Sequence, residues 1–324
     1  MRAFITGASG FAGSHLCEHL LAQPGWELFA LCFSGCSTEN LDPLHDRITM
    51  LPGDLLDAEW VYRTIAEVRP EVVFHLAALS SPSASFADPA GTLTNNIVSQ
   101  ANLFQAILLA GLNPVVLIIG SGEEYGMIRP NEVPVNEDTP LRPANPYAVS
   151  KVAQDFLALQ YFLSHGLRAV RVRPFNHIGP RQALGFVTAD FAHQIATAEA
   201  GLQPPVIRVG NLSAKRDFTD VRDMVRAYLL AATRGEPGQV YNIGSGAAHS
   251  IDEILQNLIG FSQVPLRVET DPQRMRPSDV PVLVCDSTRF HQRTGWEPRM
   301  ALARSLRDIL DYWRQRVRES SFKG

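Results

Sequence analysis

Short apolar runs recur along the first half of the chain, separated by segments with helical periodicity. The runs have the length and composition of buried strands, and they lie at residues 3–6, 27–33, 48–51, 72–78, 115–119 and 168–174. The helical segments repeat apolar residues every three or four positions, most clearly at residues 92–110 and 147–165. This alternation predicts an α/β fold with a parallel sheet.

The pattern changes after residue 176. Loops and short helices replace the regular alternation, and one further strand is predicted at residues 239–242. Two loops, at residues 214–223 and 274–279, are dense in charge, which usually indicates a solvent-exposed segment. Residues from about 319 onward are predicted to form a loose tail.

The helical segments at residues 92–110 and 147–165 carry apolar residues on more than one face. Such helices can pack against the same helices of a second copy, which would give a homodimer through a four-helix bundle. They can equally be buried within one subunit. The sequence leaves both arrangements open.

Composition and charge narrow the class of protein. The chain has 324 residues and a net charge of −4, so nothing in it predicts attraction to nucleic acid or membranes. Its four cysteines lack the spacing of a zinc site, and we expect reduced thiols and no metal. No signal-peptide layout and no bilayer-length apolar run is present. A soluble cytoplasmic protein is therefore expected.

Two chemically suited side chains lie four residues apart in the segment that starts at Pro146. On a helix, Tyr147 and Lys151 would lie one turn apart on the same face. A neighbouring ammonium favours the phenolate, so we expect a lowered pKa for the Tyr147 phenol. A phenol tuned in this way can exchange a proton with a carbinol oxygen near neutral pH.

A glycine-rich turn follows the first strand and precedes a helical pattern. It runs Gly7-Ala8-Ser9-Gly10-Phe11-Ala12-Gly13. Glycines let the backbone turn tightly and approach a pyrophosphate, and the helix N-terminus offers free N–H groups to the anion. The turn therefore predicts a dinucleotide site. The second strand ends in Cys32, Phe33 and Ser34 rather than in an acid, which favours NADP over NAD.

Residues in or after other predicted strands are further candidates for the functional site. Asp54 can accept a hydrogen bond from an adenine amino group or cap a helix, and His75 is interpreted as a core histidine. Ser121 can hydrogen-bond a substrate carbonyl oxygen beside Tyr147. Glu123 can remove a carbon-bound proton from a sugar or bond one of its hydroxyls.

Taken in order, these motifs resemble the extended short-chain dehydrogenase/reductases over residues 1 to about 176. The resemblance rests on Gly7-x-x-Gly10-x-x-Gly13, Asp54-Leu55, His75-Leu76-Ala77-Ala78, Ser121 and Tyr147-x-x-x-Lys151. It implies a Rossmann-type doubly wound parallel sheet of about seven strands, with a smaller mixed α/β C-terminal domain that binds a nucleotide sugar. In that family the tyrosine is the acid or base, the lysine binds the cofactor ribose, and the serine orients the substrate oxygen.

The resemblance also implies a division of the chain. The NAD(P)-binding domain would comprise residues 1–176 and about 215–245, the sugar-nucleotide domain 177–214 and 246–318, and the tail 319–324. The implied cofactor is NADP, with NAD possible as an alternative. Its implied contacts are Gly7, Ser9, Gly10, Phe11, Ala12, Gly13, Ser34, Asp54, Leu55, Leu76, Ala77, Ala78, Tyr147, Lys151, Pro174 and His177.

Several further stretches resemble enzymes of GDP-mannose conversion, above all the GDP-4-keto-6-deoxymannose reductases. They lie at residues 121–126, 175–180, 185–187, 209–212, 216–223 and 276–281. The partner that this resemblance implies is a GDP-linked sugar, and guanidinium forks in the two charged loops would suit its diphosphate. Its implied contacts are Ser80, Ser121, Asn176, Val187, Asn211, Arg216, Arg276 and Asp279.

The reaction expected from this resemblance is reduction of the C4 ketone of GDP-4-keto-6-deoxy-D-mannose to GDP-D-rhamnose. The alternative is a GDP-mannose 4,6-dehydratase, in which Glu123 would take the C5 proton, or another nucleotide-sugar epimerase or dehydratase. A bifunctional enzyme would lie between these. A non-catalytic NADP sensor is disfavoured because Tyr147 and Lys151 are both present.

Overall fold

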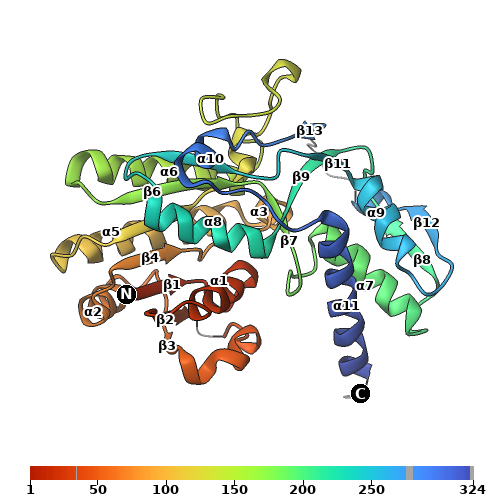
Figure 1. Ribbon diagram of the computed structural model, residues 1–324, viewed down its shortest axis with the longest axis horizontal. Helices are drawn as coiled ribbons and strands as arrows, with labels where there is room; N and C mark the ends of the chain where they lie inside the picture. The colour runs from red at the N-terminus through yellow and green to blue at the C-terminus, as the bar shows by residue number, and fades with distance from the viewer. Residues whose placement is uncertain (34, 275–279, 322–324) are drawn as a thin grey trace.

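A seven-stranded parallel sheet forms the centre of the molecule in this computed structural model, which describes residues 1–33, 35–274 and 280–321 (Figure 1). The strand order is β10-β6-β5-β4-β1-β2-β3. The strands are β1 (Arg2–Thr6), β2 (Glu27–Cys32), β3 (Thr49–Pro52), β4 (Val72–His75), β5 (Val115–Ile119), β6 (Ala169–Pro174) and β10 (Val240–Ile243). The predicted doubly wound sheet is confirmed, and its carboxyl edge is where folds of this kind bind ligands.

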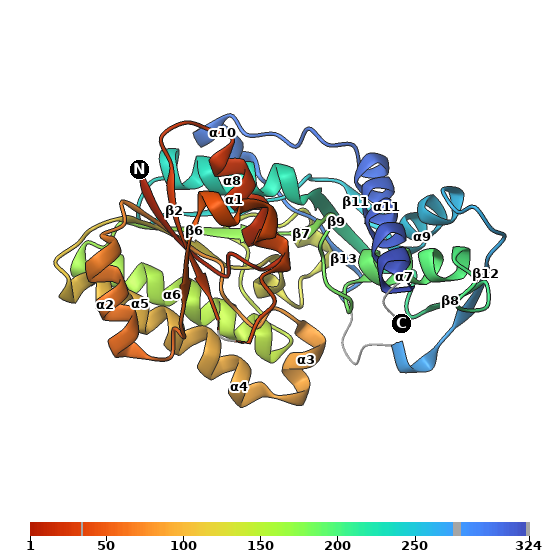
Figure 2. The same ribbon diagram turned by 90° about the horizontal axis from the view of Figure 1, so that it is seen from below.

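Helices cover both faces of this sheet, as Figure 2 shows. One face packs against α1 (Phe11–Leu21), α8 (Val221–Arg234) and α10 (Thr288–Thr294). The other packs against α2 (Ala58–Val68), α5 (Ser99–Leu109) and α6 (Pro146–His165). The strands are apolar on both faces because both are buried; Ile5, for example, belongs to one core and the adjacent Phe4 to the other.

The helix predicted over residues 92–110 is interrupted. It divides into α4 (Pro89–Leu93), a π-helical turn at Thr94–Val98, and α5; α3 (Pro82–Ala87) precedes it. Within that turn the buried Asn96 accepts from the Leu79 N–H at 2.8 Å and donates to the Ser150 hydroxyl, also at 2.8 Å. Asn96 thereby ties the loop after β4 to α6, a tertiary requirement that periodicity does not reveal.

After β6 the chain forms two smaller sheets and the helices that pack with them. Its four-stranded sheet consists of β7 (Asn176–Ile178), β9 (Lys215–Asp220), β11 (Ala248–Ser250) and β13 (Val282–Leu283), while β8 (Val206–Val209) pairs with β12 (Arg267–Thr270). The helices packed in this part are α7 (Val187–Glu199), α9 (Ile251–Gly260) and α11 (Leu302–Ser321). β9 joins this smaller sheet rather than the main one, and α11 continues past residue 319, where we expected a tail. The division into two domains stays a prediction.

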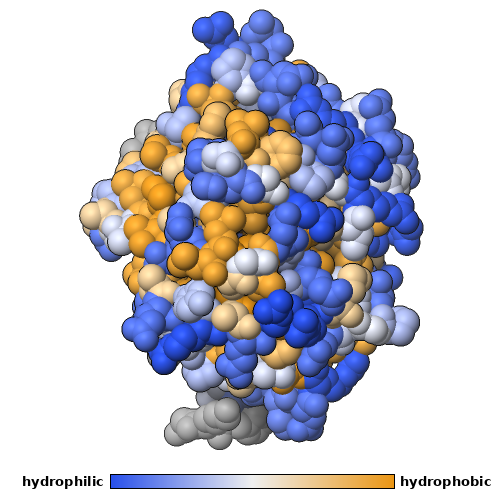
Figure 3. All heavy atoms as spheres, turned by 90° about the vertical axis from the view of Figure 1, so that its left-hand side faces the viewer, coloured by the Kyte–Doolittle hydropathy of each residue, from blue (hydrophilic) through white to orange (hydrophobic). Residues whose placement is uncertain are grey.

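Large apolar side chains remain exposed on the outer surface of α5 and α6. Leu109 is 70% exposed and Leu163 is 72% exposed, and Phe156 lies exposed between Leu163 and the start of α6. Figure 3 shows apolar surface gathered on the end of the molecule at which these helices finish. None of the described helices has the length and apolarity needed to cross a membrane. The four cysteines are free thiols, and only Cys36 is exposed.

Candidate active site

The glycine turn forms a backbone cradle at the start of α1. Gly7 has a φ of +69°, a conformation that favours glycine, and a Cβ on Gly13 would lie 2.1 Å from the Gly7 carbonyl oxygen. Gly10 is the N-cap of α1 and has no side chain to occupy the N–H groups of the first turn. The predicted strand, glycine turn and helix are confirmed, and the N–H groups of a helix's first turn suit a pyrophosphate.

The ring of Phe11 joins this cradle to the loop after β7. It stacks on the His177 ring with centroids 5.7 Å apart, and the neighbouring His15 ring contacts the Pro180 carbonyl oxygen at 3.0 Å. The predicted cofactor residues Pro174 and His177 therefore belong to the stretch that reaches the glycine turn. Phe11 and His15 are far from His177 and Pro180 in the sequence, so only the folded chain brings these segments together.

Tyr147 and Lys151 lie on one buried face of α6, as their spacing predicted. Pro146 is the first helical residue, and the Asn145 side chain caps the helix by accepting from the Ala148 N–H at 2.8 Å. The Lys151 Nζ atom lies 5.9 Å from the centre of the Tyr147 ring and donates to the Ile119 carbonyl oxygen at 2.8 Å. Helix α6 thus presents both groups at the carboxyl end of β5.

The expected lowering of the Tyr147 pKa is wrong for this protein. Burial raises the pKa of the phenol, the nearby Glu123 and Glu124 carboxylates act in the same direction, and a hydrogen bond with Ser121 opposes them. Burial also lowers the pKa of Lys151 to about 8. Desolvation therefore outweighs the pairing of ammonium and phenol that we had inferred from spacing alone.

Ser121 and Glu123 reach the same place from the turn after β5. The Glu123 N–H donates to the Ser121 hydroxyl at 3.1 Å, and the Asn145 amide donates to Glu123 Oε2 at 3.2 Å. Asn145 thus caps α6 and also holds the Glu123 carboxylate. The structure brings together the four predicted catalytic residues: Ser121, Glu123, Tyr147 and Lys151.

The ends of β3 and β4 supply the adjoining edge of the site. A Cβ on Gly7 would lie 2.9 Å from the Ala77 nitrogen, so the predicted cofactor residues Leu76, Ala77 and Ala78 follow β4 directly beside the glycine turn. Asp54 accepts from the Leu56 N–H at 2.8 Å, whereas Asp57 caps α2. Leu55 is buried between them, and Ser34 lies outside the described residues.

His75 is a core histidine, as predicted. It is buried in β4, where its Nδ1 lies 2.9 Å from the Thr6 hydroxyl. Burial lowers the pKa of its imidazole to about 3, and the positive charge of Lys151 acts in the same direction. The ring is therefore neutral at physiological pH and is not an acid or base in this site.

Two of the predicted substrate residues lie in the smaller sheet, and the others are spread over the chain. Asn176 in β7 and Arg216 in β9 lie on paired strands, and Arg216 donates to the Val280 carbonyl oxygen at 2.6 Å. A Cβ on Gly210 would meet the Arg274 carbonyl oxygen, so the loop that contains Asn211 adjoins Arg274, the first residue of the second charged loop. Val187 begins α7 and Ser80 lies exposed beyond β4. Arg276 and Asp279 lie outside the described residues.

A buried charged cluster behind Ser121 and Tyr147 was missed by the sequence analysis. It consists of Glu124, Asp155, Arg171 and Arg173, all buried. Two signals in the sequence pointed to it. Asp155 continues the four-residue spacing of Tyr147 and Lys151 along α6, and the two arginines alternate with apolar residues in β6.

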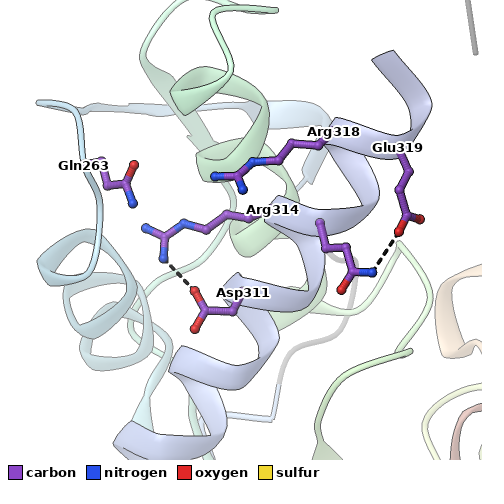
Figure 4. A pocket seen from close by; sticks show the side chains of 6 residues that line it. Gln263, Asp311, Arg314, Arg318 and Glu319 are labelled. Atoms are coloured by element: carbon purple, nitrogen blue, oxygen red, sulfur yellow. Dashed lines mark hydrogen bonds and ion pairs between the residues drawn. The ribbon is translucent and has the colours of Figure 1, made fainter. Parts of the chain in front are cut away.

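A surface hollow of about 440 Å³ lies elsewhere, along α11 (Figure 4). It is lined by Gln263, Asp311, Arg314, Gln315, Arg318 and Glu319. Its polar groups pair with one another: Arg314 donates to Asp311 at 2.7 Å, and Gln315 donates to Glu319 at 2.8 Å. None of the predicted site residues lines it, and we assign it no role.

Comparison with known proteins identifies the family. The family model described as GDP-mannose 4,6 dehydratase matches residues 4–309. The chain belongs to this family. GDP-6-deoxy-D-mannose reductase of Pseudomonas aeruginosa is 39% identical over 319 residues, which is 98% of this chain and 99% of the relative.

Two solved structures agree with this family assignment. RMD from Pseudomonas aeruginosa, complexed with NADPH, matches with a TM-score of 0.85 and 37% identity over 97% of this chain and 99% of the other. A UDP-glucose 4-epimerase from Thermus thermophilus, complexed with NAD, matches with a TM-score of 0.86 and 30% identity over the same shares. NADP and NAD are cofactors of this family, and the glycine cradle of this chain fits either. The chain is an NAD(P)-dependent enzyme of the extended short-chain dehydrogenase/reductase type.

Proposed function

We propose that this member of the GDP-mannose 4,6-dehydratase family reduces the C4 ketone of GDP-4-keto-6-deoxy-D-mannose, giving GDP-D-rhamnose. The observation that carries the proposal is the position of Tyr147, with Ser121 and Lys151 beside it, at the sheet edge that bears the glycine cradle. Near full-length similarity to a GDP-6-deoxy-D-mannose reductase supports this choice of substrate.

The raised pKa of Tyr147 suits a reduction. A phenol that burial keeps protonated at neutral pH is in the state required of a proton donor. When bound, NADPH supplies the hydride that C4 accepts. Tyr147 then donates its proton to the oxygen on C4, and the Ser121 hydroxyl steadies the charge that develops there. Lys151 holds a positive charge beneath the phenol below a pH of about 8.

NADPH is the proposed reductant in preference to NADH. Phe33 follows β2 and is 50% exposed, so the described end of this strand offers no acidic side chain to repel a 2′-phosphate. The complex of RMD with NADPH, at 37% identity, supports the same choice.

The nucleotide half of the substrate is proposed to lie against the smaller sheet. Arg216 lies in β9, the strand that pairs with the Asn176-bearing β7, and its guanidinium can pair with a diphosphate. Arg274 and Val280, the described residues on either side of 275–279, contact the same region through Gly210 and Arg216.

A second candidate is GDP-mannose 4,6-dehydration, and Glu123 favours it. Its main-chain N–H donates to the Ser121 hydroxyl, and its carboxylate accepts from Asn145 and acts electrostatically on the Tyr147 phenol, so this group can serve as the base for a C5 proton. The two reactions are separated by two assays. GDP-mannose with catalytic NADP yields a 4-keto product only from a dehydratase, whereas GDP-4-keto-6-deoxy-D-mannose consumes stoichiometric NADPH only with a reductase. Turnover of the first substrate alone would overturn our proposal.

A homodimer through α5 and α6 is also proposed. Leu109 and Leu163 are each at least 70% exposed at the ends of these helices, and Phe156 is exposed on the same helix as Leu163. Pairing with a second copy would remove this apolar surface from water, at a gain of about 25 cal/mol per Å² buried.

A further inference from the structure

Glu124 is a fully buried carboxyl group directly behind the proposed active site. Its Oε1 atom accepts a hydrogen bond from the main-chain N–H of Ser121 at 2.7 Å. Its Oε2 atom lies 3.1 Å from Nε of Arg173 but receives no hydrogen bond, because that N–H is directed to Asp155 at 2.7 Å. One oxygen of Glu124 therefore holds Ser121, and the other lies buried without a donor.

A proton on Glu124 would satisfy that second oxygen. The protonated carboxyl group can donate a hydrogen bond to Asp155, whose own oxygens are held by Arg171 and Arg173. Burial raises the pKa of Glu124, the Asp155 carboxylate acts in the same direction, and Arg173 opposes them. The raised pKa, about 8, brings Glu124 into the range in which its carboxyl group gains or loses a proton near neutral pH.

The groups around Glu124 connect its charge to the site. Helix α6 presents Tyr147, Lys151 and Asp155 toward it, and strand β6 presents Arg173. A negative charge on Glu124 raises the pKa of the Lys151 amine and also that of the Tyr147 phenol. The carboxylate of Glu123, the residue before it, accepts a hydrogen bond from Asn145 instead.

We propose that Glu124 is a positioning residue for the reaction. Its carboxyl group fixes Ser121 through the main-chain N–H, and its proton sets the charge of the Lys151 amine beneath Tyr147. When Glu124 loses its proton, its negative charge favours the protonated form of Lys151. The amine thereby stays charged to a higher pH than its burial alone would allow. The catalytic part of this inference rests on the proposed reductase function.

The chain offers a direct test because it has only three lysines: Lys151, Lys215 and Lys323. Labelling lysine with ¹³C at the ε-carbon gives three NMR signals, and the Lys151→Arg variant identifies that of Lys151. The full chain is titrated from pH 6 to pH 11 as wild type and as Glu124→Gln. Glutamine keeps an oxygen for the Ser121 N–H but cannot carry a charge.

We expect the midpoint of Lys151 to fall by about one pH unit in Glu124→Gln, while that of the exposed Lys215 stays unchanged. An unchanged Lys151 midpoint in a folded Glu124→Gln protein would overturn the inference. If this variant does not fold, the wild-type curve decides. Coupling to Glu124 spreads the Lys151 titration over a wider pH range than one isolated group, and a curve for a single independent group contradicts the coupling.

Turnover supplies the second readout. In Glu124→Gln the alkaline limb of the pH profile of kcat/KM should move to lower pH, whereas a purely structural defect would lower kcat/KM equally at every pH. Glu59→Gln, on the exposed surface of α2, is the matched control and should leave the profile unchanged. If the wild type turns over neither GDP-sugar, the proposed function fails, and the lysine titration still decides the role of Glu124.

Discussion

The Nζ atom of Lys151 lies 5.9 Å from the centre of the Tyr147 ring, and both side chains are buried. Burial makes this pair costly: it raises the pKa of the phenol and lowers that of the amine to about 8. Burial therefore favours the neutral form of both side chains. This affects the stability of the fold and the proton transfer proposed for Tyr147.

Stability should depend on the protonation of Lys151. The pKa of lysine is 10.5 in the unfolded chain and about 8 in the folded one, so between these values the unfolded chain binds more protons. The free energy of unfolding should therefore rise across this window, by on the order of 3 kcal/mol relative to Lys151→Met. Urea unfolding at pH 7.5 and pH 10.5 measures the difference. Lys215→Met, at an exposed position, should track the wild type at both pH values.

The end of β2 should govern the choice of coenzyme. Phe33→Asp places a carboxylate where a 2′-phosphate would lie, so we expect the ratio of NADPH to NADH affinity to fall at least about tenfold. Phe33→Asn has nearly the same shape without the charge and serves as the control. Fluorescence titration with each coenzyme gives both dissociation constants, and an equal ratio in the two variants would contradict the placement of Phe33.

The glycine cradle should not tolerate a side chain. In Gly13→Ala the new Cβ would lie 2.1 Å from the Gly7 carbonyl oxygen, so we expect a loss of about 1–3 kcal/mol in stability and severely weakened coenzyme binding. Gly260→Ala is the matched control, because a Cβ there meets nothing within 4 Å. Thermal unfolding and coenzyme titration of both variants provide the comparison. Undiminished coenzyme binding by Gly13→Ala would count against the cradle.

The apolar surface of α6 should control the oligomeric state. Leu163→Glu introduces a charge at a position that the proposed dimer would bury, so we expect it to give monomers at concentrations where the wild type is dimeric. Leu202→Glu is the control, because Leu202 is also exposed, at 59%, but lies beyond α7. Light scattering after gel filtration reports the mass. A monomeric wild type would refute the proposed interface.

Local patterns in the sequence predicted much of this structure. The glycine turn lies between one strand and one helix, and the Tyr147–Lys151 pair lies on a single helix, so spacing alone predicted both. The π-helical turn around Asn96 was missed, because it depends on contacts with Leu79 and Ser150. Such contacts join segments that only the folded chain brings together.

Electrostatic properties were harder to predict for the same reason. The spacing of Tyr147 and Lys151 indicated attraction, but the direction of each pKa shift was decided by burial, which is a tertiary property. The cluster around Glu124 likewise joins a turn, a helix and a strand. Each of its charged residues, taken alone in the sequence, has the ordinary appearance of a surface group.

The proposed reduction depends on proton donation from Tyr147 to the sugar oxygen. Its most direct test is NADPH oxidation by wild type and Tyr147→Phe with GDP-4-keto-6-deoxy-D-mannose, alongside the exposed control Tyr62→Phe. We predict that Tyr147→Phe loses about 10²–10⁴-fold in kcat while its affinity for NADPH is retained, and that Tyr62→Phe matches the wild type. Wild-type turnover in Tyr147→Phe would rule out Tyr147 as the proton donor.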